Sequence, residues 1–162
     1  MAFLEIKKAG DPVLKKVCEP VTKIDKRLRR LLDDMAETMY ASDGVGIAAP
    51  QVGESIRVCV VDVDTKSHNE RYDLINPVIT YREGSVVDNE GCLSCPDLFG
   101  DVERATKIRV EYTSRFNKKK TLEAEGLLAR CIQHELDHLD GKLFIDVAKN
   151  ITKGRPNKKT ED

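Results

Sequence analysis

Residues 126–140 restrict the fold more than any other segment, because they place two histidines in an otherwise apolar helical pattern. The periodicity predicts a helix that ends at Gly141, a typical stop signal. His134 and His138 then leave the same face of the helix, with their roots about 6 Å apart. Unpaired imidazoles would be costly among the apolar residues of this helix, which include Leu127, Leu128, Cys131, Ile132 and Leu139. We therefore expect a central helix whose two histidines share a partner.

The two histidines belong to an H-E-x-x-H motif, which is a metal-binding pattern. Both rings can bind one ion, and Glu135 beside them can act as a general base for a water on that ion. In one large protease class the motif continues to a third histidine, but Phe144 occupies that place here. A general H-E-x-x-H metalloprotease stays open as an alternative. The third ligand must come from elsewhere in the chain.

The stretch GCLSC offers Cys92 and Cys95 as candidates for that ligand. Cys131 is on the same helix as the histidines, but it lies about 10 Å from residue 138, too far for one ion with bonds of roughly 2.0–2.3 Å. It fits better as an apolar residue lining a pocket beside the ion. Two cysteine ligands would close a structural Cys2His2 zinc site, whereas one would leave a position for water. A redox C-x-x-C module would need a βαβ context, which is absent.

The remaining pattern combines one more helix with a block of strands. Residues 25–41 predict an amphipathic helix with Asp25 as its N-cap, and the glycine-rich stretch 42–54 predicts a loop with closely approached backbone. Strands are expected at 56–63, 72–81, 107–113 and 119–126, with a turn around Asn117 between the last two. This order favours an α+β fold, a single compact domain with antiparallel or mixed sheets around the central H-E-x-x-H helix.

Composition excludes several classes of protein. The chain has 162 residues and a formal net charge of −1, so no global basic field draws it to nucleic acid. No stretch approaches the roughly 18 apolar residues of a membrane span, and the first residues lack the apolar core of a signal peptide. Five cysteines cannot all pair, which favours a reducing cytoplasm. We expect a domain at 1–148 and a short polar, basic tail at 149–162.

Three segments, taken together and in order, resemble the signature segments of the peptide deformylases. They are GVGIAAPQ at 44–51, EGCLS at 90–94 and QHELDH at 133–138, and the resemblance extends over roughly residues 3–147. It implies a metal-dependent hydrolase of the bacterial cytoplasm that removes the formyl group from the N-terminal N-formylmethionine of newly synthesised proteins. A metal-bound hydroxide would attack the formyl carbon, and formate would be released.

The resemblance also implies a role for individual residues. Cys92, His134 and His138 would hold Fe²⁺, with Zn²⁺, Ni²⁺ or Co²⁺ as possible substitutes. Glu135 would be the general base and acid. The side-chain amide of Gln51 and the backbone N–H of Leu93 would then form the oxyanion hole. The residues expected to bind the substrate are Gly44, Val45, Gly46, Gly91, Leu127 and Cys131.

The implied partners are N-formylmethionyl nascent polypeptides, with neither a membrane nor nucleic acid among them, and the chain is expected to be a monomer. The basic residues after 148 suggest contact with the ribosome. Two residues depart from the family, which usually has apolar side chains at their positions. Arg130 would narrow or charge the pocket entrance, or point to solvent. Cys95 would be a small apolar residue turned away from the metal. Glu90 and Arg104 resemble the family's ion pair near the metal loop.

Overall fold

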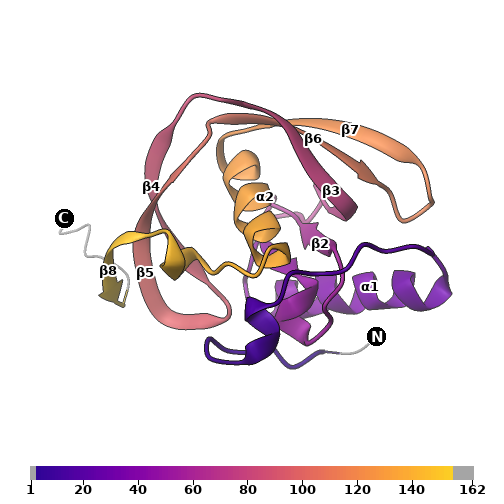
Figure 1. Cartoon of the computed structure of the whole chain (residues 1–162), viewed down its shortest axis with the longest axis horizontal. Helices are drawn as coiled ribbons and strands as arrows, with labels where there is room; N and C mark the ends of the chain where they lie inside the picture. Colours follow the sequence, from indigo (N-terminus) through magenta and orange to yellow (C-terminus); the bar gives the residue numbers. More distant parts are fainter. Residues whose placement is uncertain (1–2, 155–162) are drawn as a thin grey trace.

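Helix α2 passes through the middle of the structure, between two antiparallel sheets (Figure 1). The computed structural model describes residues 3–154. The elements are η1 (Pro12–Lys15), α1 (Lys26–Ala41), β1 (Gly46–Ala48), η2 (Ala49–Val52), β2 (Val58–Val61), β3 (Tyr72–Glu83), β4 (Val86–Cys92), β5 (Cys95–Arg104), β6 (Lys107–Thr113), β7 (Lys119–Glu125), α2 (Gly126–Leu139), η3 (Phe144–Asp146) and β8 (Lys149–Lys153). The larger sheet has the order β1-β2-β3-β6-β7 and the smaller one β4-β5-β8.

Strand β2 separates two layers of the core, because its alternate side chains point to opposite faces of the sheet. Cys59 and Val61 pack in a cluster with α2, whereas Val58 and Val60 pack in a cluster with α1. A third cluster lies between the smaller sheet and the two short helices η1 and η3. All four residues of β2 are fully buried. The α+β class and the central position of the H-E-x-x-H helix are thus confirmed.

The two predicted helices and all four predicted strands are present, with small changes at their ends. Helix α1 begins after Asp25, whose side chain accepts a hydrogen bond from the backbone N–H of Leu28 at 2.9 Å. The turn between β6 and β7 has Asn117 at a φ of 62°, a backbone region that asparagine tolerates better than most residues. No helix among the described residues is long and apolar enough to cross a membrane.

Four strands were not predicted. Strand β1 and the short helix η2 lie in the stretch 42–54, which was expected to be a loop; β1 forms because its backbone pairs with β2. Strands β4 and β5 carry Asp, Asn, Glu, Gly and Pro residues in place of an apolar alternation. They are stabilised by pairing with each other and, in the middle, by buried charged side chains, which a propensity pattern does not reveal. Strand β8 is fully exposed and pairs with β5, although its residues were expected to belong to the polar tail. Residues 155–162 of that tail lie outside the described part of the chain.

Gly141 ends α2 where the chain passes close to η1. Its φ is +77°, and a Cβ atom placed there would lie 2.5 Å from the carbonyl oxygen of Lys15. The neighbouring backbone is held nearby, because the N–H of Cys18 donates to the carbonyl of Leu139 at 2.9 Å. Glycine is therefore required by both the conformation and the contact.

We expect Gly141→Ala to lower the free energy of unfolding by about 2–4 kcal/mol, since the left-handed conformation costs a non-glycine residue about 1–2 kcal/mol and the clash adds to it. Gly126→Ala is the matched control, because Gly126 has a φ of +60° with nothing within 4 Å of an added Cβ. Urea denaturation of both variants measures the difference. Equal losses would show that the approach of η1 has no energetic consequence.

Candidate metal centre

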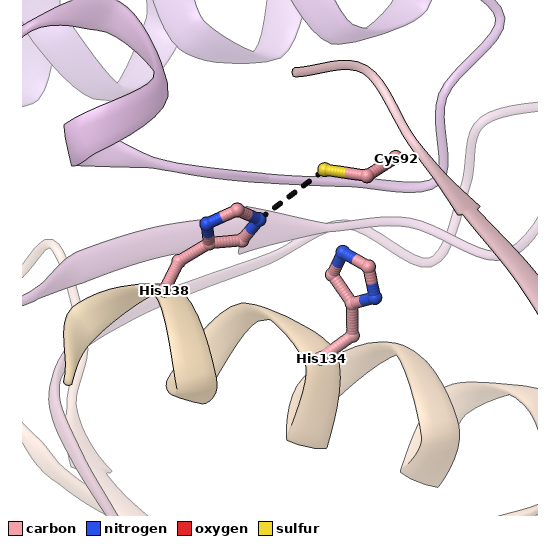
Figure 2. A group of neighbouring side chains, drawn as sticks. All are labelled: Cys92, His134 and His138. Atoms are coloured by element: carbon pink, nitrogen blue, oxygen red, sulfur yellow. Dashed lines mark hydrogen bonds between the residues drawn. The ribbon is translucent and has the colours of Figure 1, made fainter. Parts of the chain in front are cut away.

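Cys92, His134 and His138 bring three potential ligand atoms together beside α2 (Figure 2). Each pair of these atoms lies within 4.8 Å, and Nε2 of His138 is 3.3 Å from Sγ of Cys92. Atoms bonded to one ion at roughly 2.0–2.3 Å are separated by at most about 4.6 Å. The group needs little or no movement to bind a single ion.

The three ligands come from two parts of the fold. Both histidines project from one face of α2, as the four-residue spacing predicts, and Cys92 ends β4 at the two-residue turn before β5. Phe144, the residue at the place of the third histidine in the protease motif, stacks on the ring of His134 with 6.1 Å between centroids. His68 is exposed and stacks on Tyr40, away from the centre.

The protonation of His134 follows from its hydrogen bond to Glu90. Burial opposes ionisation of Glu90, but its bonds to His134 and Arg104 outweigh this effect and lower its pKa to about 2. Glu90 is therefore an acceptor only, so the Nδ1 atom of His134, 2.9 Å from Oε1, carries the proton. The other ring nitrogen, Nε2, faces Cys92 (Figure 2) and is the one available to a metal. Burial opposes the charged form of His134, but the bond to Glu90 outweighs this effect and raises the pKa of the ring, so a metal ion would compete with a proton for Nε2.

His138 is held in its neutral, metal-binding form by its surroundings. It is fully buried, and this burial, together with the charges of His134 and Arg104, lowers its pKa well below the usual value. A neutral imidazole can offer a nitrogen lone pair to a metal. The structure therefore supplies one thiol and two imidazoles, a donor set that suits Fe²⁺, Zn²⁺, Ni²⁺ or Co²⁺ better than the hard ions Mg²⁺ and Ca²⁺. These residues fit the implied metal.

Cys95 does not complete a four-ligand group. Its Cα atom is paired with that of Cys92 across the hairpin, but the described group of ligand atoms contains only the other three residues. The Cys95 side chain is 2% exposed and packs with Leu14, Val102 and Phe144. The hydrogen bond between the two cysteines is the main cause, and burial the second, of a pKa of the Cys92 thiol that lies well above its usual value. Cys95 is thus a neighbour of the sulfur ligand and part of an apolar cluster.

Glu135 lines the same cavity as Cys92 and His134. It is 4% exposed, and burial raises its pKa to about 7. Its Oε1 atom has no hydrogen-bond partner within the described residues. A Cβ atom on Gly46 would lie 2.5 Å from Oε2, so only glycine lets β1 pass over this carboxylate. Such a group can accept and release a proton near neutral pH.

Gln51 presents its amide nitrogen to the centre because its oxygen is already bound. The backbone N–H of Ala48 donates to Oε1 at 2.9 Å, which fixes the orientation of the amide. Nε2 then donates to Oγ of Ser94 at 3.2 Å and lies 3.6 Å from Sγ of Cys92. The resulting donor is buried, held by hydrogen bonds at both ends of the amide, and next to the sulfur of Cys92.

A cavity of about 570 Å³ opens onto this group of side chains. All residues that the sequence predicts for substrate binding line it, as do Leu93, Gln51, Glu135, Cys92 and His134. The walls also contain Asn89 and Phe99, which sequence reasoning missed. They reach the cavity because β4 and β5 pair there, and those strands were not predicted.

The side chain of Arg130 does not point to solvent, which was one of the two expectations for it, but it does line the cavity, as the other expectation requires. It is 8% exposed and donates to Oε2 of Glu90 at 2.5 Å, to the carbonyl of Val102 at 3.0 Å and to that of Val86 at 2.9 Å. Arg104 binds Glu90 through two nitrogens, at 2.9 and 3.0 Å, as the resemblance implies for this ion pair. Asp137 reaches this network only through Arg104.

Comparison with known proteins places this geometry in a family. The polypeptide deformylase family model matches residues 3–154. The peptide deformylase of Alkalilimnicola ehrlichii is 47% identical over 161 residues, which cover 99% of this chain and 90% of that protein. Peptide deformylase 1 of Bacillus cereus is 55% identical over 144 residues, covering 89% of this chain and 91% of the relative.

Solved structures agree with this result. The crystal structure of peptide deformylase from Thermotoga maritima has a TM-score of 0.87 and 44% identity, and the match covers 92% of this chain and 99% of that one. The enzyme from Synechococcus elongatus, crystallised with actinonin, has a TM-score of 0.88 and 42% identity, with 91% and 81% covered. The chain described here therefore belongs to the polypeptide deformylase family.

Proposed function

We propose that this chain removes the formyl group from N-formylmethionyl polypeptides by hydrolysis, at a metal ion held by Cys92, His134 and His138. The observation that carries this proposal is the convergence of three ligand atoms within 4.8 Å, beside the buried carboxylate of Glu135 and at the wall of a cavity. Three protein ligands leave a further coordination position open, which is typical of catalytic and not of structural sites.

We propose Fe²⁺ as the natural metal, with Zn²⁺, Ni²⁺ or Co²⁺ as substitutes, because a mixed thiolate and imidazole set accepts all four. When bound, the ion would polarise the formyl oxygen and lower the pKa of a coordinated water. The chain's own contribution is to fix the ligands before binding. His134 is oriented by Glu90, and His138 is kept neutral by burial.

Glu135 is the proposed proton carrier. Its Oε1 atom, which has no partner within the described residues, can take the proton of the attacking water and deliver it to the nitrogen of the departing amine. Negative charge that develops on the formyl oxygen would be stabilised by the amide N–H of Gln51 and the backbone N–H of Leu93. Donors fixed in advance stabilise the transition state more than the ground state.

The substrate backbone is proposed to lie between two strand edges. Strand β1 is at one edge of the larger sheet and β4 at one edge of the smaller sheet, and residues near both line the cavity. An extended peptide can pair with such edges as an added strand, near Gly44, Gly46 and Gly91. The methionine side chain would occupy the apolar part of the cavity formed by Val45, Leu127 and Cys131.

We also propose that residues 1–148 contain the catalytic machinery and that the chain acts as a monomer in the cytoplasm.

The basic segment 149–162 is proposed to contact the ribosome. This proposal rests on charge, since the five residues of β8 are exposed and include Lys149 and Lys153. Replacing both lysines by serine should reduce co-sedimentation with ribosomes at low salt. Arg109→Ser, which changes one exposed cation on β6, is the control; unchanged co-sedimentation of the double variant would refute the contact.

The central experiment measures formate release from formyl-Met-Ala-Ser by anaerobically prepared, Fe²⁺-loaded protein. We expect activity in the wild type, no hydrolysis of acetyl-Met-Ala-Ser, and a loss of about 10²–10⁴-fold in Glu135→Ala, which lacks the proton carrier. Glu111→Ala removes an exposed carboxylate on β6 and should leave the rate unchanged. Absence of formate release from the wild type would refute the proposed reaction, and cleavage of internal peptide bonds would favour a general metalloprotease instead.

Replacing each cysteine of GCLSC in turn separates an open centre from a closed one. Cys95→Ala should still bind one equivalent of Co²⁺, with the thiolate-to-metal charge-transfer band of a single sulfur ligand. Cys92→Ala should lose that band and bind the ion weakly, because one of its three ligands is gone. Absorption titration of the apo-proteins measures both quantities. A wild-type band intensity corresponding to two thiolates, halved in Cys95→Ala, would establish the closed Cys2His2 site.

A further inference from the structure

We propose that Arg130 is a positioning residue for the metal centre, which holds both the Cys92 hairpin and the Glu90–His134 hydrogen bond in place. Its guanidinium joins one turn of α2 to both strands of the β4–β5 hairpin. The bonds to Val86 and Glu90 are with β4, and the bond to Val102 is with β5. This inference rests on the ligand set proposed above and assigns a function to a residue outside that set.

The hairpin reaches α2 mainly through hydrogen-bonded polar side chains and not through a shared apolar cluster. The helix packs mainly against β1, β2, β6 and β7, all of the larger sheet. The smaller sheet instead has its own apolar cluster with η1 and η3. The buried contacts of Glu90 with Arg130 and His134 therefore connect the strand that carries Cys92 to the helix that carries both histidines.

Arg130 acts on two ligands through these bonds. The Oε1 atom of Glu90 accepts a hydrogen bond from Nδ1 of His134, and its Oε2 atom accepts one from Arg130. The guanidinium therefore fixes the carboxylate that orients the His134 ring. Cys92 lies two residues further along β4, and its Sγ atom is 3.3 Å from Nε2 of His138. A shift of this strand would move the sulfur and the carboxylate together. Arg104 makes a second link between the hairpin and α2, through Asp137 at 2.7 Å. Its other two nitrogens bind Glu90, so it does not hold the backbone carbonyls of Val86 and Val102 as Arg130 does.

A lysine or an apolar residue could not make the same set of contacts. The planar guanidinium offers donors in fixed directions, which lets one side chain bind a carboxylate and two carbonyls at once. The two carbonyl oxygens would lose their side-chain donor if the side chain were apolar. The expected consequence is a looser arrangement of the ligands, and loss of an oriented partner of this kind usually weakens metal binding about 10–100-fold.

The test is a Co²⁺ titration of the apo form of Arg130→Met, monitored by calorimetry and by the absorption spectrum. We expect the variant to remain folded by circular dichroism, to bind Co²⁺ about 10–100-fold more weakly than the wild type, and to show altered d–d bands. Arg109→Met makes the same chemical change at an exposed site on β6 and should bind Co²⁺ as the wild type does. Arg130→Lys retains only the charge, so its affinity for Co²⁺ should lie between those of the wild type and Arg130→Met.

A folded Arg130→Met with the wild-type affinity and spectrum would overturn the proposal, since Arg130 would then contribute to stability alone. If Arg130→Met does not fold, the same titration on Arg130→Lys decides, and wild-type values there would overturn it equally. Failure of the underlying function has a different signature. In that case the wild type itself would show no Co²⁺–thiolate band and release no formate.

Discussion

Both oxygens of the buried Glu90 carboxylate accept hydrogen bonds, from Arg104, Arg130 and the Nδ1 atom of His134. A carboxylate that is 7% exposed would be strongly disfavoured without such partners. Here the partners lower its pKa to about 2, so the charged form is the stable one. Because Glu90 belongs to β4 and His134 to α2, satisfying this charge requires the smaller sheet to lie against the helix. The three candidate metal ligands then meet as a consequence of the fold.

The apolar core provides the complementary constraint. Strand β2 directs alternate side chains to α1 and α2, which fixes the larger sheet between two helices. Helix α2 is consequently buried on the side of that sheet and has its two histidines on the side of the β4–β5 hairpin. His138 is completely buried at this junction. Few rearrangements are available to a side chain packed in this way, and a preformed ligand set costs less to order when an ion binds.

The sequence was most informative where apolar periodicity is strong. It placed α1, α2 and the strands β3, β6 and β7 within a few residues, because their buried faces recur at helical or strand spacing. It failed for β1, β4, β5 and β8, whose positions depend on pairing and, for β4 and β5, on buried charges. The spacing of His134 and His138 identified the metal motif, but the choice of Cys92 over Cys95 came only from resemblance. The orientation of Arg130 could not be inferred, because its partners belong to the strands that were missed.

The cavity lies where two sheets approach each other without joining. The edge strand β1 contributes Gly46 and the edge strand β4 contributes Gly91 to its walls, and both edges are unpaired on that side within the described residues. At Gly46 a side chain would meet Glu135, and at Gly91 it would meet the ring of Phe99. Glycine on each edge therefore keeps the backbone open exactly where the ligand-bearing elements converge. An extended peptide pairing with both edges would connect the two sheets directly over the metal ligands, so binding energy from its backbone would position its N-terminal group for reaction.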